Sequence, residues 1–447
     1  MGTYTELYIA DFPVHSTKSA VDSTVMSIFR ESDKIVEERA VSARNALMWS
    51  EASESEEKET VVEYSATVEQ VIDRLNIMGF TINASKVWFD LGVKEKLDTY
   101  NECAKDNDSE WIQPKIDLLE TYTFEKYVEA LSKIYDKKLV RWTSKEDLPE
   151  DTDPITTFIY DDQDYEMYFG YPAYDIRHFL RVFLEIVPKS SLVIQDISDL
   201  VDGGYYDIEE NVCEGAIDEL IGDYLVDSKV LILTEGSSDK NFLEPALKLL
   251  YPHLADYFSF MDFGVSKASG GASVLVTTIK AFIGAGIGNR VVALFDNDTA
   301  AKVALKALKD VDIPNTIKLV HYPDIEICND YPTIGPSGLS NLNINGLAGS
   351  IEVYLGVDTL EIDGELTPVQ WKGYDSSLKQ YQGEIVDKGL VQKRYQEKVK
   401  ICQDDPAKIL ESDWSGIRAI CNAVFDCFED YLPNKSMHSD SLKLTGD

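Results

Sequence analysis

Hydrophobic residues recur every three or four positions over much of the first half of the chain, which is the spacing of a helix with one buried face. The clearest case covers residues 68–78, with Ser65 or Thr67 as a cap before it and Gly79 at its end. The same spacing predicts helices over residues 115–119, 124–135 and 174–187. Residues 3–10, before a turn at Phe12-Pro13, indicate a short strand.

Two acidic stretches interrupt this pattern. Residues 51–60 are rich in Glu and predict a solvated helix or loop, and residues 145–164 are punctuated by Pro and predict a loop. Residues 1–226 are therefore predicted to form a mainly helical N-terminal region.

From Val230 the pattern changes to short apolar runs that alternate with helical spacing. The runs are VLILTEG (230–236), FSFMDF (258–263), VVALFDND (291–298) and TIKLVHY (316–322), and the helical stretches are 239–250, 272–282 and 299–308. This alternation predicts a mostly parallel α/β sheet of the Rossmann-like kind. We place this domain at residues 227–357.

The rest of the chain is predicted to be a helical extension, residues 358–432, followed by a flexible tail, residues 433–447. The uncharged stretch 331–350 is predicted to be a mobile loop beside the sheet. Residues 371–400 combine a local surplus of Lys and Arg with aromatic rings that could stack on bases, although an ordinary helix face bearing Lys explains them as well. The fold class is thus α+β multidomain.

Composition narrows the function. The chain of 447 residues is 44% hydrophobic, which excludes disorder for its bulk. It carries 42 Lys and Arg against 79 Asp and Glu, a net charge of −37, so any contact with nucleic acid must be local rather than through bulk charge. The six scattered Cys indicate neither disulfides nor a zinc module. Without a signal peptide or membrane span, we expect a cytoplasmic protein that does not contact membranes.

Four carboxylates follow the predicted strands. Glu235 and Asp239 come after the first strand, and Asp296 and Asp298 come after the third. Because the carboxyl ends of parallel strands meet at one edge of a sheet, these side chains are expected to converge. Such a cluster needs protons or cations to offset its repulsion, and oxygen ligands suit Mg²⁺ or Mn²⁺. Two such ions would suit phosphodiester hydrolysis, although a solvated sheet edge is the simpler alternative.

These motifs, TEGSSDKNFLE and VVALFDND, resemble the Toprim domain shared by bacterial primases, topoisomerases, recombination-associated proteins and OLD-family nucleases. The TEGxxD form and the later SIEVYL favour the OLD-type branch. The resemblance implies that the residues Glu235, Asp239, Asp296, Asp298 and Glu352 bind two metal ions, with Glu235 and Asp296 also catalytic. For Glu352 a surface carboxylate on a helix is an equal alternative. We add Lys388 as a cation for the scissile phosphate, since developing charge must be stabilised.

The first half resembles the HEPN/Toprim N-terminal domain through GTYTELYIADFPVHSTKS and the run FRESDK…ERAVSARNALMW. HEPN ribonucleases carry Arg followed by His after four to six residues, and no His of this chain has an Arg at that spacing before it. We therefore expect a scaffold or sensing role for this half. Arg177, Arg181 and Glu185 predict an exposed, ion-paired helix face.

The function that these features predict is a Mg²⁺- or Mn²⁺-dependent endonuclease acting on DNA or RNA, in the company of bacterial anti-phage defence proteins. One alternative is a component that binds nucleic acid or an ATPase without cutting. The chain has no G-x-x-x-x-G-K-[ST] loop, so any ATPase would be a separate partner chain. Another alternative is a primase- or topoisomerase-like enzyme. Oligomers are compatible with the sequence.

Overall fold

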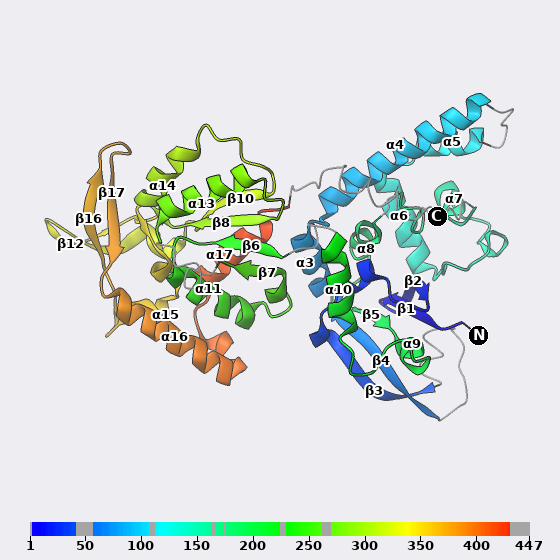
Figure 1. Cartoon of the computed structure of the whole chain (residues 1–447), viewed down its shortest axis with the longest axis horizontal. Coiled ribbons are helices and arrows are strands. Elements are labelled where there is room, and N and C mark those ends of the chain that lie inside the picture. Colours follow the sequence, from blue (N-terminus) through cyan, green and yellow to red (C-terminus); the bar gives the residue numbers. More distant parts are fainter. Residues whose placement is uncertain are drawn as a thin grey trace. The chain divides into compact units, whose positions relative to one another are not determined.

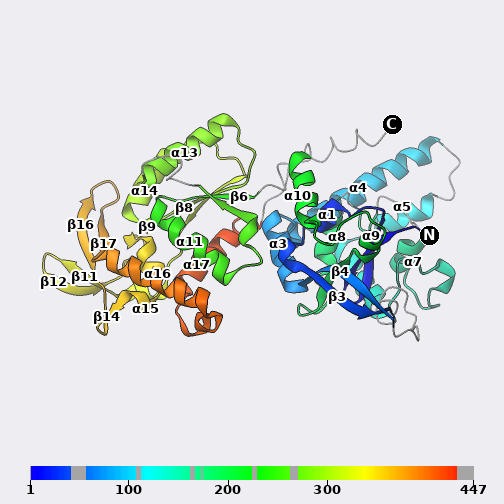
Figure 2. The same ribbon diagram turned by 60° about the horizontal axis from the view of Figure 1, so that its bottom comes forward.

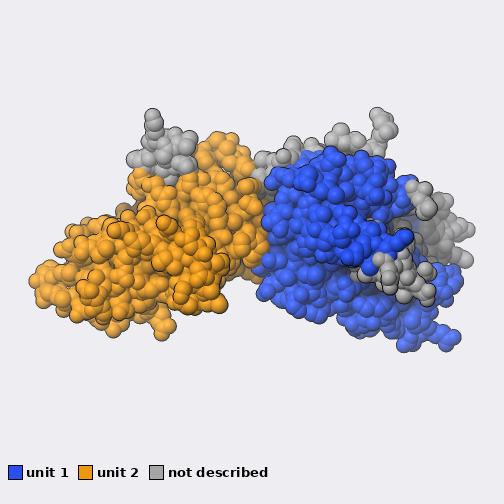
Figure 3. Space-filling model, turned by 90° about the horizontal axis from the view of Figure 1, so that it is seen from below, with its two compact units in different colours: residues 1–227, 432–447 blue, residues 228–431 orange. Residues whose placement is uncertain are grey.

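The computed structural model describes residues 2–41, 57–106, 112–161, 167–172, 175–223, 229–261 and 270–429. The chain divides into two compact units, the first consisting mainly of residues 1–227 and the second of residues 228–431 (Figure 3). The predicted tail, residues 433–447, lies outside the described part. Every helix found in the described ranges is too short or too polar to cross a membrane.

The first unit contains a five-stranded antiparallel sheet, in the order β2-β1-β5-β4-β3 (Figure 1). Its strands are β1 (Tyr4–Ile9), β2 (Phe12–Lys18), β3 (Lys34–Ala40), β4 (Lys58–Thr67) and β5 (Leu192–Asp196). The tight turn between β1 and β2 is made by Ala10 and Asp11, with φ of 51° and 62°. The prediction of a turn at Phe12-Pro13 is therefore wrong by two residues, because these residues already belong to β2.

The sheet corrects the prediction of a mainly helical N-terminal region, which foresaw only one strand here, at residues 3–10. β3 is an edge strand whose middle residues are exposed on both faces, so it carries charge and shows no alternation. β4 buries Val61 to Tyr64 in succession, which also conceals the period of two. Residues 58–60 of the acidic stretch thus begin a strand, while residues 51–56 lie outside the described ranges.

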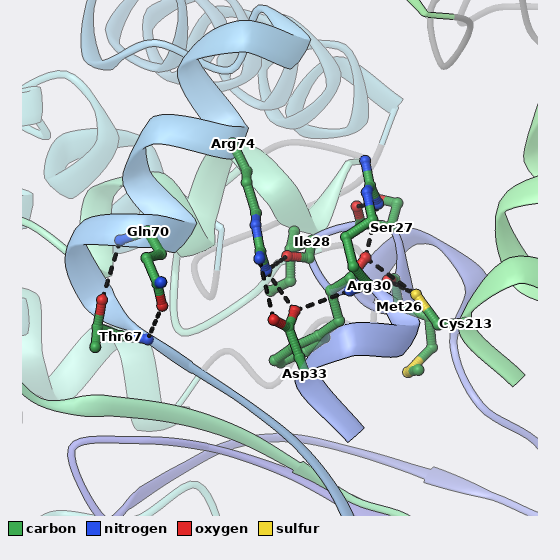
Figure 4. A network of polar contacts seen from close by, with 10 residues as sticks. Met26, Ser27, Ile28, Arg30, Asp33, Thr67, Gln70, Arg74 and Cys213 are labelled. Atoms are coloured by element: carbon green, nitrogen blue, oxygen red, sulfur yellow. Dashed lines mark hydrogen bonds and ion pairs between the residues drawn. The ribbon is translucent and has the colours of Figure 1, made fainter. Parts of the chain in front are cut away.

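Helices surround this sheet. They are α1 (Ser23–Met26), α3 (Val68–Met78), α4 (Ile82–Asp106), α5 (Gln113–Leu119), α6 (Phe124–Asp136), α7 (Pro154–Asp161), α8 (Ile176–Phe183), α9 (Ser198–Asp202) and α10 (Val212–Asp223). Of the two predicted caps of α3, Thr67 is the one found and Ser65 is not: Thr67 and Gln70 form a reciprocal capping box (Figure 4). The predicted end is confirmed, because Gly79 ends the helix with φ of 96°. The predicted loop over residues 145–164 is wrong in part, because it contains α7.

Helix α8 does not present an exposed charged face. Arg177 and Arg181 are both buried, and their guanidinium groups pair with Asp175 and Glu185 at 2.8 and 2.6 Å. The predicted Arg181–Glu185 pair therefore exists, but the exposure of this face was wrongly predicted. The neighbouring His178 is also buried, next to Ser85 Oγ at 3.1 Å.

The second unit is built on a four-stranded parallel sheet, in the order β10-β8-β6-β7. Its strands are β6 (Val230–Leu233), β7 (Phe258–Phe260), β8 (Val291–Phe295) and β10 (Ile317–His321), and its helices are α11 (Ser237–Leu250), α13 (Ala272–Ala285), α14 (Thr299–Leu305) and α17 (Ser415–Asp426). The predicted alternation of strands and helices, and the parallel sheet, are confirmed.

Helices cover both faces of this sheet (Figures 1 and 2). Val291, Ala293 and Phe295 of β8 pack in a core with α13, whereas Leu294 points to the other face, where α11 and α17 lie. Alternate residues of the strand are thus buried on opposite sides. This explains why its sequence is continuously apolar up to Asp296.

A second sheet follows, in the order β12-β11-β16-β17. It is formed by β11 (Tyr331–Gly335), β12 (Gly338–Leu342), β16 (Val369–Asp375) and β17 (Gln380–Ile385), and the short pairs β9–β13 (Asn297–Asp298 with Ala348–Gly349) and β14–β15 (Glu361–Ile362 with Glu365–Leu366) adjoin it. The stretch 331–350 is therefore a hairpin and a short strand, not a loop. The predicted helical extension begins with strands and becomes helical at α16 (Lys388–Asp404), after the short α15 (Val357–Leu360).

Candidate metal and phosphodiester site

Glu235 and Asp239 lie at the junction between β6 and α11. Glu235 is the second residue after the strand, and the Asp239 carboxylate Oδ2 accepts a hydrogen bond of 2.9 Å from the Gly236 N–H. The Glu235 carbonyl accepts another of 2.6 Å from the Gly271 N–H at the start of α13. A Cβ on Gly270 would stand 2.9 Å from that carbonyl oxygen, so the close approach of the two segments requires glycine there.

Asp296 and Asp298 lie at the end of β8, the strand next to β6. The Asp296 N–H donates to Glu235 Oε1 at 3.0 Å, which joins the two strand ends directly. Asp298 caps α14: its Oδ1 accepts from the Ala301 N–H at 2.8 Å, and its Oδ2 accepts from Gln382 Nε2 at 2.8 Å. Asp296 differs, because its Oδ1 is buried and has no hydrogen-bond partner among the described residues.

Glu352 is brought to the same place by the pairing of β13 with β9. Pairing of Gly349 with Asn297 and of Ala348 with Asp298 positions the 3₁₀ turn Ile351–Tyr354 beside them. Glu352 is only 3% exposed and accepts hydrogen bonds from Ser350 Oγ and Gln392 Nε2 at 2.7 and 2.8 Å. The alternative of a surface carboxylate on a helix is thus incorrect.

Lys388, the first residue of α16, faces these carboxylates. Its Nζ lies 3.7 Å from Glu352 and 3.1 Å from Glu384. Burial disfavours its charge, but Glu352 and Glu384 outweigh this and raise the pKa of Lys388 above its ordinary value. The ammonium group is therefore held charged at the edge of the cluster.

The carboxylates repel one another. Burial, aided by the charges of Asp298 and Asp239, raises the pKa of Glu235 to about 7. Burial and the charge of Glu352 raise the pKa of Asp239 to about 7, although the Gly236 N–H and Lys388 oppose this rise. The pKa of Asp296 is also raised, by burial first and then by the other four carboxylates. Asp296 thus lies within electrostatic reach of the other four carboxylates predicted from the sequence.

The donors are all oxygen atoms, which suits a hard divalent cation, and the unpartnered Asp296 Oδ1 is available to one. Nevertheless, nowhere in the described ranges are three or more His, Cys, Asp or Glu side chains arranged as a ready metal-binding group. The residues therefore fit a metal in chemistry and charge, while the side chains as they stand do not enclose one.

Several neighbours of the site escaped the sequence analysis. Gln382 binds Asp298 from a hairpin more than eighty residues later, and Gln392 binds Glu352 from α16, so no local pattern identifies either. Tyr322 could have been found, because it follows β10, the strand next to β8, and its N–H donates to the Phe295 carbonyl at 2.9 Å. It is fully buried, and burial and the charges of Asp239 and Asp296 raise its pKa.

Comparison with known proteins gives one match, to the first half of the chain. Searches of curated proteins and of solved structures found no match. A family model does match: residues 1–219 fit the model described as HEPN/Toprim N-terminal domain 1, which supports an association of this chain with HEPN/Toprim proteins.

Proposed function

We propose that the second unit hydrolyses phosphodiester bonds of DNA or RNA with Mg²⁺ or Mn²⁺, at a Toprim-like site of the OLD type. The observation that carries the proposal is that Lys388 offsets only part of the negative charge of the carboxylate cluster. Glu235, Asp239 and Asp296 have raised pKa values at the carboxyl ends of adjacent parallel strands. A cluster of this kind is stabilised by protons at low pH or by cations at neutral pH.

The residues would divide the work according to their present contacts. Asp296, with its unpartnered oxygen, and Glu235, whose Oε1 accepts from the Asp296 N–H, would hold the metal, with Asp239 beside them. Asp298 and Glu352 each have both oxygens hydrogen-bonded and would contribute chiefly charge, and Asp298 would also orient the β8–α14 turn. When bound, the ions supply an activated water and neutralise the phosphate oxygens.

Lys388 would act on the substrate rather than on the metal. Its ammonium group lies at the rim of the cluster, paired with Glu352 and Glu384, and it is only partly buried. A phosphate group that approached the carboxylates would meet this positive charge, which would stabilise the extra negative charge of the transition state.

The family match supports the same class of function. The name of the matched domain suggests a nuclease or another role with nucleic acid, and it concerns the half of the chain that does not carry the carboxylates. We propose that this half is a scaffold or sensor for the second unit. A role in anti-phage defence with a separate ATPase chain is a further proposal that rests on the OLD-type resemblance.

The proposal is tested by incubating labelled plasmid, linear duplex DNA, single-stranded DNA and tRNA with the protein and Mg²⁺ or Mn²⁺. We expect Asp296→Asn and Glu235→Gln each to lower the cleavage rate by about 100-fold or more, since each removes a charge that only the metal and transition state require. Asp312→Asn, which removes an exposed carboxylate of the same unit, is the matched control.

Cleavage by Asp296→Asn and Glu235→Gln at the wild-type rate, with the same metal dependence, would reject the site. The wild-type protein could instead bind the substrates without cutting them, even when co-purified proteins are added. That result would favour the alternative of a binding component that does not cleave.

A further inference from the structure

The hairpin of β16 and β17 carries a group of aromatic rings on its surface. Tyr374 and Tyr381 are opposite each other in the register and each is 56% exposed. Their ring centroids are 5.0 Å apart, and the ring of Trp371 lies 6.0 Å from that of Tyr381. Exposed aromatic side chains in direct contact with one another are unusual on a soluble surface, where they are normally buried or cover a partner.

The hairpin sequence makes room for the indole ring. Trp371 lies between Gly335 of β11 and Gly383 of β17, and a Cβ on these glycines would stand 3.5 and 3.1 Å from the ring. Because neither neighbour has a side chain, the indole can lie across the sheet instead of standing away from it. The three rings together, Trp371, Tyr374 and Tyr381, are called the aromatic platform below.

Strand β17, which carries Tyr381, is hydrogen-bonded to the segment that bears Asp298. The carbonyl of Tyr381 accepts a hydrogen bond of 2.7 Å from Thr299 Oγ1, the residue after Asp298. The next residue, Gln382, donates to Asp298 Oδ2 and accepts from the Ala300 N–H. Figures 1 and 2 agree in placing this hairpin beside α14, the helix that Asp298 caps.

Lysines flank the aromatic platform. Lys372 and Lys379 are exposed on the hairpin, and the exposed Lys306 of the neighbouring α14 segment donates to Ser377 Oγ at 2.8 Å. The two acids of the hairpin are engaged, Asp375 in capping the turn through Ser377 and Leu378, and Glu384 in its pair with Lys388. Three exposed cations beside aromatic rings fit a polyanion whose flat groups can stack.

We propose that the aromatic platform binds single-stranded nucleic acid, with unpaired bases stacked on Tyr374 and Tyr381 and the backbone near Lys306, Lys372 and Lys379. In a duplex the base faces are covered by their neighbours, so the platform selects strands with unpaired bases. This inference rests on the proposed hydrolysis, because it assigns the substrate class of the same site.

The test measures binding separately from cleavage. In an Asp296→Asn background, which prevents cutting, the affinity is measured by fluorescence anisotropy for labelled dT20, rU20, a 20-base-pair duplex and an abasic strand with the same phosphates. We expect the base-bearing single strands to bind best, and the double change Tyr374→Ala with Tyr381→Ala to weaken them roughly tenfold or more. The abasic strand should bind equally with and without the two rings.

Two further variants separate stacking from other causes. Tyr374→Phe with Tyr381→Phe keeps the rings and should bind like the parent. Tyr205→Ala removes a tyrosine of the first unit that is 52% exposed and should change nothing. A higher affinity of dT20 than of rU20, or the reverse, identifies the sugar that the site prefers.

The outcomes distinguish the two proposals. Unchanged affinity of the double alanine variant, equal affinity for base-bearing and abasic strands, or tighter binding of the duplex overturns the aromatic platform. If one of these results overturns the aromatic platform and the wild-type protein still cleaves, the proposed hydrolysis stands without the platform. Base-dependent binding that the two tyrosines provide, in a protein that never cleaves, supports the platform and overturns the hydrolysis.

Discussion

Buried arginines of the first unit are paired with carboxylates, whereas the second unit gathers five carboxylates of which, among the described residues, only Glu352 forms an ion pair, with Lys388. Arg74 is almost fully buried and reaches both oxygens of Asp33, at 2.6 and 3.1 Å, and the Ile28 carbonyl at 3.0 Å (Figure 4). Burial by itself would raise the pKa of Asp175, but the Arg177 guanidinium holds it at about 2.

The carboxylate cluster of the second unit has the opposite electrostatics. Lys388 offsets part of the charge, yet the pKa values of Glu235 and Asp239 still rise to about 7. Buried charges that are paired stabilise a fold, whereas buried like charges destabilise it until a ligand or proton neutralises them. The difference is the one that we expect if the first network serves structure and the second, as proposed above, binds a cation.

The largest expected effect is on the paired network. Replacing the arginine in Arg74→Met leaves Asp33 without its partner, and we expect the first unit to lose about 3–5 kcal/mol of unfolding free energy. Hydrogen exchange of peptides from α3 and β4 measures this loss for the first unit alone. The exposed pair of Lys133 with Glu129 is the control, since Lys133→Met should leave the unfolding free energy nearly unchanged.

A divalent cation should raise the stability of the second unit and leave that of the first unit unchanged. At a Mg²⁺ or Mn²⁺ concentration 100 times the dissociation constant, binding to the folded protein adds about 2.7 kcal/mol to its stability. We expect slower hydrogen exchange in β6 and β8 with metal, and no change in α3. A gain of the same size in Asp296→Asn would contradict the role of Asp296.

Neutralising one carboxylate should stabilise the metal-free protein. Asp296→Asn removes a buried charge that four others oppose, so we expect a gain on the order of 1–2 kcal/mol without metal, although the residue is buried. Thermal or urea unfolding in EDTA measures it. A clear loss of stability there would show that Asp296 supports the fold and is not an uncompensated ligand.

The smallest expected effect is on the way the unfolding free energy depends on pH. Glu235 and Asp239 have folded-state pKa values of about 7, above their ordinary values of 4.5 and 3.8. The folded protein therefore holds more protons than the unfolded chain between these limits, and the stability from these groups is lost as the pH rises from about 4 to about 7. In EDTA, the difference between wild type and Asp296→Asn should widen by about 1 kcal/mol between pH 5 and 8. If this difference in unfolding free energy narrowed as the pH rose, the change would have the sign opposite to the one that the raised pKa values predict.

The sequence by itself determined the elements whose signals are local. The stop at Gly79 and a cap at Ser65 or Thr67 defined α3 to within two residues, because the positive φ depends on Gly79 and the capping hydrogen bonds join only Thr67 and Gln70. Short apolar runs that end at Glu235 and Asp296 indicated parallel strands buried on both faces. Since adjacent parallel strands end at one edge, the meeting of these two carboxylates followed from topology.

Only the tertiary structure decided the features that depend on distant neighbours. β3 shows no alternation because it is an edge strand. Arg177 and Arg181 are buried because, besides their local carboxylate partners, Ser27 and Asn76 accept hydrogen bonds from them across more than a hundred residues. The hairpin of β16 and β17, the burial of Glu352 and its contact with Lys388 arise from pairings across dozens of residues. Burial and charge compensation are properties of the assembled core, and these decide whether a carboxylate is a surface residue or a potential ligand.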